Sequence, residues 1–109
     1  MVEILDFREA SGRPVEAHGS VGVVARALVR ADHAAVTVLH VAAGGEIGRH
    51  PAPVDQLLVV VSGRGRVQGG SGPWADVGAG QAVVWRAGEE HVTRADEALT
   101  ALVVELPLS

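Results

Sequence analysis

The residues best suited to chemistry in this 109-residue chain are two histidines, His50 and His91, and one glutamine, Gln56. Neutral imidazoles bind divalent transition metals and hydrogen-bond to polar ligands. The amide of Gln56 offers an oxygen acceptor and two N–H donors but carries no charge. A site built from these three side chains would therefore leave open positions for water or for a ligand.

The remaining composition excludes several kinds of chemistry. All nine basic residues are arginine, and the sequence lacks lysine, cysteine and tyrosine, which removes Schiff-base, thiolate and phenol mechanisms as well as disulfides. A formal charge of -4 without a basic stripe argues against a nucleic-acid partner. The longest apolar run, residues 57–61, is too short to cross a bilayer, so we expect a cytoplasmic protein with no membrane partner.

Short β-strands are the elements expected to hold these side chains. Valine- and alanine-rich runs are separated by glycine and proline, which favours strands over helices. Residues 21–29 also fit a helical pattern, but the β-branched Val23 and Val24 favour a strand. The other expected strands are 2–7, 34–41, 56–61, 65–68, 81–85, 91–94 and 100–106. Turns are expected at Gly44 and Gly45, Ser62 and Gly63, 69–73, 78–80, and Ala87 and Gly88.

Regular strand spacing with short turns predicts a single all-β domain over residues 1–109, an antiparallel sandwich or barrel. His50 and Ala52 are two residues apart, so on an extended strand they point to the same face. Gln56 begins the next expected strand. His91 comes from a separate strand pair, which a barrel can bring opposite His50.

The spacing around His50 forms a first motif. Five residues separate Gly44 from His50, and one separates His50 from Ala52. Three residues then precede Gln56, and six more precede Gly63. These gaps agree with the first cupin motif, G-x(5)-H-x-H-x(3,4)-E-x(6)-G.

The spacing around His91 forms a second motif. From Gly80, five residues lead to Arg86, one more to Gly88, two to His91 and three to Ala95. The gaps agree with the second cupin motif, G-x(5)-P-x-G-x(2)-H-x(3)-N. The chain therefore resembles a small single-domain bacterial cupin, with motifs at about 44–63 and 80–95. The resemblance implies a cupin-like antiparallel β-barrel, also called a double-stranded β-helix or jelly roll.

The resemblance also implies a metal site with altered ligands. In cupins the first motif supplies two histidines and a glutamate to a metal, and the second motif supplies a third histidine. Here His50 and His91 are retained, whereas Ala52 stands in place of a histidine and Gln56 in place of the glutamate. The implied ligands are His50, Gln56 and His91, and the implied ion is a divalent transition metal such as Zn, Fe, Ni, Mn or Cu. The loss of one ligand and of the ligand charge predicts weak binding.

These observations predict a barrel that binds a small polar molecule in an interior cavity lined by His50, Gln56, Trp85 and His91, with a weakly held metal. Polar groups converging in an interior cost about 1–3 kcal/mol each when unpaired, which a purely structural core would avoid. Two alternatives remain: a metal-dependent dioxygenase, isomerase or decarboxylase, and a structural domain with a vestigial cavity. Whether the protein is an enzyme is left open.

Expectations for the other polar residues are less specific. His18 and His33 lie near expected loops and are predicted to be solvated, and the sequence does not orient His40 or the three charged residues of the second motif, Arg86, Glu89 and Glu90. The apolar character of both faces of strands 56–61 and 100–106 predicts a homodimer, because a domain this small buries little of its surface alone.

Overall fold

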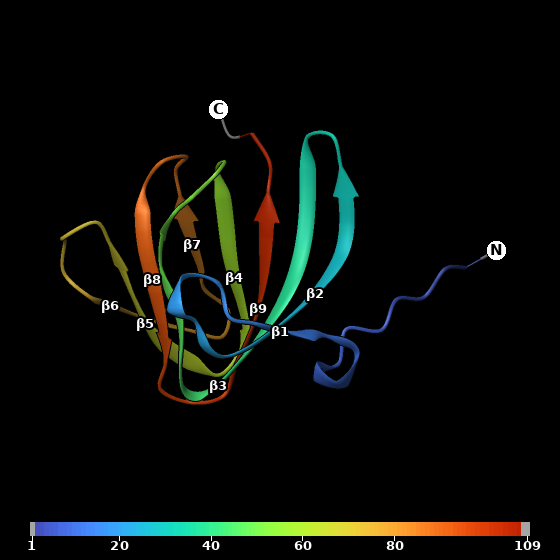
Figure 1. Ribbon diagram of the computed structural model, residues 1–109, viewed down its shortest axis with the longest axis horizontal. Coiled ribbons are helices and arrows are strands. Elements are labelled where there is room, and N and C mark those ends of the chain that lie inside the picture. The colour runs from blue at the N-terminus through green and yellow to red at the C-terminus, as the bar shows by residue number, and fades with distance from the viewer. Residues whose placement is uncertain (1, 108–109) are drawn as a thin grey trace.

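The computed structural model describes residues 2–107 and shows a nearly closed antiparallel β-barrel, which confirms the expected fold class (Figure 1). The strands are β1 (Arg13–Val15), β2 (Val21–Ala31), β3 (Ala34–Pro51), β4 (Gln56–Ser62), β5 (Arg64–Gly69), β6 (Ala75–Gly78), β7 (Ala82–Trp85), β8 (Glu90–Ala95) and β9 (Leu99–Glu105). Two short 3₁₀ helices, η1 (Glu9–Ser11) and η2 (Ala17–Gly19), flank β1. No helix in the described residues is long or apolar enough to span a bilayer.

Strand β3 connects the two halves of the barrel. Its first half pairs with β2 on one side and with β9 on the other, and its second half pairs with β8. The hydrogen-bonded order is β6-β5-β8-β3-β9-β4-β7, with β2 attached to β3 and β1 attached to β2. One continuous strand therefore supplies both a part of the barrel wall and the part of the first motif that carries His50.

The expected turn at Gly44 and Gly45 is wrong, because β3 runs through both residues. The pairing of β2 with β3 instead jumps from Val23 opposite Val41 to Val21 opposite Glu46, which leaves a bulge in β3. Gly44 has φ +79°, a conformation that glycine adopts without steric cost. The two adjacent glycines thus mark a bulge within β3 rather than the end of the strand.

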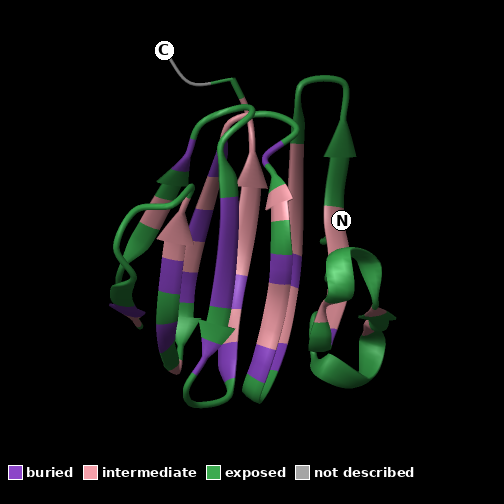
Figure 2. Ribbon diagram, turned by 60° about the vertical axis from the view of Figure 1, so that its left-hand side comes forward, coloured by how far each residue is buried: buried purple, intermediate pink, exposed green. Residues whose placement is uncertain are grey.

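The interior of the barrel is filled by alternate side chains, as Figure 2 shows by the alternation of buried and exposed positions along the strands. On β4, Gln56, Leu58 and Val60 are buried, whereas the intervening residues are half-buried or exposed. The remaining buried apolar cluster comprises Val23, Val41, Ala52, Val67, Val77, Trp85, Ala95, Leu99 and Ala101. Burial of this apolar area, worth about 25 cal/mol per Å², is the main force that holds the sheet closed.

The N-terminal expectations differ from the structure at two places. Residues 2–7 are not a strand: they extend to one side of the barrel (Figure 1), attached by a hydrogen bond from Arg26 Nε to the Asp6 carbonyl. The Asp6 carboxylate also accepts hydrogen bonds from the backbone N–H and the guanidinium of Arg8, which is a local contact within this segment. Residues 21–29 are confirmed as a strand, and β1 and β6 were not expected because both are short and contain proline or glycine.

The homodimer stays a prediction, and the outer face of β4 and β7 is where it would form. Val61 and Val84 are 49% and 47% exposed on this face. We expect light scattering at micromolar concentration to give twice the mass of one chain, and Val84→Asp to shift the protein toward monomer. Val21→Asp, at an exposed site on β2, is the control that should leave the mass unchanged. A monomeric wild-type protein across this range would contradict the prediction.

Candidate functional site

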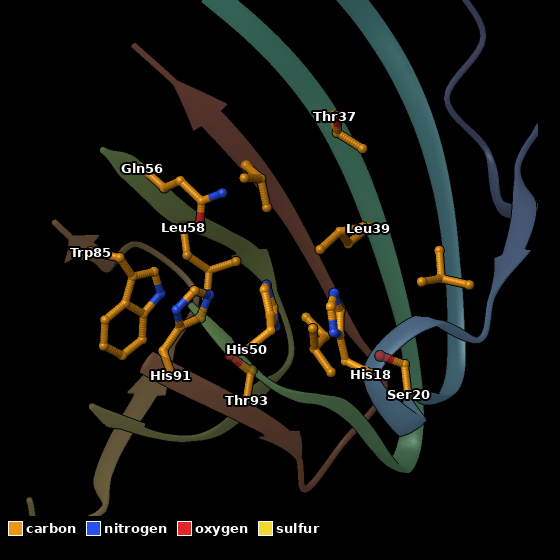
Figure 3. A pocket seen from close by; sticks show the side chains of 13 residues that line it. His18, Ser20, Thr37, Leu39, His50, Gln56, Leu58, Trp85, His91 and Thr93 are labelled. Carbon is orange, nitrogen blue, oxygen red and sulfur yellow. The ribbon is translucent and has the colours of Figure 1, made fainter. Parts of the chain in front are cut away.

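A cavity of about 210 Å³ lies inside the barrel between the two motifs (Figure 3). Its apolar lining consists of Val15, Leu39, Ile47, Leu58, Val103 and the indole of Trp85, and its polar lining consists of His18, Ser20, Thr37, His50, Gln56, His91 and Thr93. The four residues predicted for the cavity wall, His50, Gln56, Trp85 and His91, are therefore brought together. Of the described residues, no carboxylate and no arginine line this cavity.

The pairing of β3 with β8 places His50 directly opposite His91. The centroids of the two imidazoles are 4.4 Å apart and the ring planes are tilted by 57°. His91 is 5% exposed, whereas His50 is half-buried at the cavity wall. Two strands that are distant in sequence thus present a pair of imidazoles to one space.

Both imidazoles have a fixed tautomer. Nδ1 of His50 lies 2.7 Å from the Gly48 carbonyl oxygen, and Nδ1 of His91 lies 3.1 Å from the Glu89 carbonyl oxygen. Because a carbonyl oxygen only accepts, each Nδ1 carries the hydrogen and donates it, and each neutral ring keeps a lone pair on Nε2. Within the described residues no hydrogen bond uses either Nε2 atom. The pair is therefore set to accept a proton, a hydrogen bond or a metal ion.

Burial keeps His91 neutral. Desolvation lowers the pKa of the His91 imidazole from its ordinary value, and the neighbouring His50 lowers it further. The hydrogen bond from His91 to the Glu89 carbonyl opposes this change but is the smaller effect. At neutral pH the His91 ring is thus an uncharged base or ligand nitrogen.

Gln56 is held by a carboxylate that the sequence analysis did not single out. Its Nε2 donates a 3.0 Å hydrogen bond to Oε2 of Glu105, the residue opposite it on β9. This contact turns the amide oxygen of Gln56 toward the two imidazoles (Figure 3). No hydrogen bond joins Gln56 to either imidazole within the described residues.

Trp85 and His18 extend the imidazole pair into a row of four rings (Figure 3). The Trp85 ring stacks on His91 with centroids 4.7 Å apart, and it is also part of the buried core. The His18 ring stacks on His50 with centroids 4.6 Å apart and planes 11° apart. His18 is exposed, as expected of a solvated residue, but the sequence did not predict that its ring stacks on His50 at the cavity wall. No periodic pattern marks residues 16–20, and η2 reaches the cavity only because the chain folds back over β3.

The other polar candidates lie outside the cavity. His33 is exposed, and His40 donates from Nε2 to the Phe7 carbonyl oxygen, 2.8 Å away. Arg86 and Glu90 are exposed, and a carboxylate oxygen of Glu89 accepts the backbone N–H of Arg86, which closes the turn of the second motif. Glu89 and Glu90 therefore do not reach the cavity as acid or base.

Ala52 leaves the first motif without a second imidazole. Its side chain is buried in the core, and its backbone bonds to the second motif through the Glu89 carbonyl and the Gly88 N–H. In the described residues no group of three His, Cys, Asp or Glu side chains is arranged to hold a metal ion. The two motifs supply two imidazole nitrogens and the Gln56 amide oxygen to the cavity as potential metal ligands.

Comparisons with known proteins agree with this architecture. The family model described as "Cupin domain" matches residues 37–105. A conserved protein of unknown function from Streptococcus pyogenes is 31% identical, with a TM-score of 0.71 over 80% of this chain and 75% of that chain. The polyketide cyclase RemF from Streptomyces resistomycificus is 20% identical, with a TM-score of 0.78 over 95% of this chain and 80% of that chain.

A further solved structure has a similar fold over almost the whole chain. A cupin family protein from Methanocaldococcus jannaschii with a double-stranded β-helix fold is 16% identical, with a TM-score of 0.76 over 98% of this chain and 93% of that chain. The comparison with curated proteins finds no match. The family match spans both motifs and the strands that carry His50, Gln56 and His91. The chain belongs to the cupin family.

Proposed function

We propose that the cavity binds a small molecule that has an apolar body and an acidic O–H or N–H group. The supporting observation is the pair of Nε2 atoms on His50 and His91, which take part in no hydrogen bond within the described residues and face a cavity lined by no arginine or carboxylate. A ligand hydrogen bonded to one of these acceptors would contribute about 0.5–1.5 kcal/mol, the typical net value of one hydrogen bond. The same pair is suited to accept a proton from the ligand, as a general base does.

The size and charge of the cavity narrow the ligand class. A volume of about 210 Å³ is below the roughly 300–1,000 Å³ of drug-sized ligand pockets, so the ligand is small. Since no arginine or carboxylate lines the wall, a permanent charge on the ligand would have no fixed counter-ion. A small weak acid fits the volume and needs no counter-ion other than the site itself, because an imidazole takes up the proton of the acid on binding.

Weak metal binding is the second candidate function, and the fixed tautomers of His50 and His91 favour it. Donation from Nδ1–H to a backbone carbonyl is the arrangement that orients metal-binding imidazoles. With the Gln56 amide oxygen, the two rings form a neutral donor set for Zn, Fe, Ni, Mn or Cu. A bound metal would polarise a ligand oxygen or lower the pKa of a water molecule. A protein with such a metal would be the metal-dependent enzyme that the sequence analysis gives as an alternative. One protein of similar fold, RemF, is a polyketide cyclase.

The binding proposal predicts that benzoate, a small acidic probe, contacts the two imidazoles and is bound together with one proton from solvent, which supplies the hydrogen that Nε2 accepts. We expect benzoate to shift the ring resonances of His50 and His91 in an NMR titration. His50→Gln removes one Nε2 acceptor and should weaken benzoate binding by about three- to tenfold, the effect of one hydrogen bond. His33→Gln, at an exposed site, should leave the affinity unchanged. A wild-type protein whose His50 and His91 resonances do not respond would overturn the proposal.

The metal candidate predicts weak Zn²⁺ binding that improves when a carboxylate enters the cavity. The double variant Gln56→Glu with Glu105→Gln reverses the hydrogen bond between the two side chains while keeping the net charge. We expect calorimetry to show at least a tenfold higher affinity for Zn²⁺ in the double variant than in the wild type, since even residues around a metal site change affinity by about 10–100-fold. Glu105→Gln alone is the control. Equal affinities in all three proteins would mean that Gln56 does not face the metal position.

The lowered pKa of His91 predicts that stability falls in acid. In the unfolded chain His91 titrates near 6.5, above its folded pKa, so between these values the unfolded state binds more protons. The free energy of unfolding should therefore decrease as the pH falls below about 6.5 and be fully recovered above it. Urea unfolding at pH 7.5 and 5.5 measures the difference. His91→Gln should reduce this pH dependence and His33→Gln should reduce it less; equal slopes in all three would contradict the prediction.

A further inference from the structure

The N-terminal strap, residues 13–20, forms one side of the cavity although it lies outside the family match at residues 37–105. It consists of β1, η2 and Ser20, and it supplies Val15, His18 and Ser20 to the lining. Figure 3 shows His18 and Ser20 reaching the cavity from this segment, on the side away from Trp85. The strap therefore adds polar groups that neither motif provides.

The strap is seated on β3 beside His50. The Ser20 hydroxyl accepts a 3.0 Å hydrogen bond from the backbone N–H of Gly48, and a Cβ atom at Gly48 would overlap the carbonyl oxygen of His18. Only glycine lets the two backbones approach this closely. The position of His18 is thus fixed by the same short segment of β3 that carries His50.

The backbone of His18 is strained. Its φ of +59° and ψ of +26° lie in the left-handed region, and it is the only described non-glycine residue with positive φ. Such a conformation costs of order 1–2 kcal/mol and persists where the surrounding structure imposes it. Here it places the imidazole, which stays solvent-exposed, at the cavity wall and against the His50 ring. No hydrogen bond within the described residues engages the ring nitrogens of His18.

The geometry of the ring row separates the role of His18 from that of the imidazole pair. The rings of His18 and His50 are nearly parallel, so their in-plane lone pairs do not converge on one atom as those of metal ligands do. His50 lies between His18 and His91 in the row. A ligand group that hydrogen-bonds to a ring nitrogen of His18 would therefore lie at a second position in the cavity, separate from the position between His50 and His91.

We infer that His18 is a ligand-contacting residue that makes the cavity selective for bifunctional molecules, which carry a second polar group in addition to the acidic one. This inference rests on the proposed binding of a small acid by His50 and His91. In this arrangement the acidic group is bound by the imidazole pair, and the second group, a hydroxyl or carbonyl, hydrogen-bonds to His18. Hydroxy acids and keto acids of compact shape are the matching ligand class.

The test compares benzoate with its 3-hydroxy and 4-hydroxy derivatives by calorimetry or NMR titration. Wild-type protein should bind at least one hydroxybenzoate about three- to tenfold more tightly than benzoate, the effect of one additional hydrogen bond. His18→Phe keeps a flat ring to stack on His50 but has no nitrogen, so it should abolish this preference, measured as the ratio of hydroxybenzoate affinity to benzoate affinity in the same variant. His18→Asn, which tolerates the left-handed backbone, keeps a polar group without the stack and should retain part of the preference.

A backbone variant tests the position of the strap without changing a ring. Gly48→Ala should displace the strap and remove the hydroxybenzoate preference, whereas Gly78→Ala should not, because a Cβ atom at Gly78 makes only ordinary contacts. If benzoate binds but the preference is missing in the wild type, or persists in both His18→Phe and Gly48→Ala, the role of His18 is overturned and the proposed function stands. If the wild-type protein binds none of the three probes, both fail.

Discussion

The alignment of β3 with β8 is the constraint on which the site depends. It sets His50 opposite His91, and a slip of one residue would turn one imidazole to the other face of the sheet. Backbone hydrogen bonds at the end of the ladder hold this register: Ala52 N–H to the Glu89 carbonyl, and Gly88 N–H to the Ala52 carbonyl. The small side chain of Ala52, buried in the core, fits where these two segments meet. The same few residues thus fix both the fold and the distance between the imidazoles.

The cavity is polar without being charged. His91 is kept neutral by burial, Gln56 is an amide, and the nearest carboxylate, that of Glu105, is directed at the Gln56 N–H group. Such a set of groups is less costly to bury than ions, because neutral dipoles lose far less hydration energy than charges do. The barrel can therefore hold these polar groups around an interior cavity without a charged residue in the described part of its lining.

The sequence predicts most of the fold and part of the site, and the differences have physical causes. The two motifs place His50, Gln56, Trp85 and His91 because their spacing reflects strand length and alternation, which are local properties. His18 and Glu105 enter through long-range contacts that no spacing encodes: the strap folds back over Gly48, and Glu105 meets Gln56 only through the pairing of β9 with β4. The turn predicted at Gly44 is wrong because a glycine with positive φ occurs in a β-bulge as well as in a turn.

The central place of β9 affects how the chain can fold. Residues Leu99–Glu105 pair with β3 on one side and β4 on the other, so those two strands have no ladder between them until β9 is present. During synthesis, the edges of β3 and β4 that pair with β9 therefore stay unpaired until some forty further residues have been added after β4. Such late, distant pairing slows folding and exposes the nascent chain to aggregation. The last strand of the barrel therefore decides when β3 and β4 are joined in one sheet.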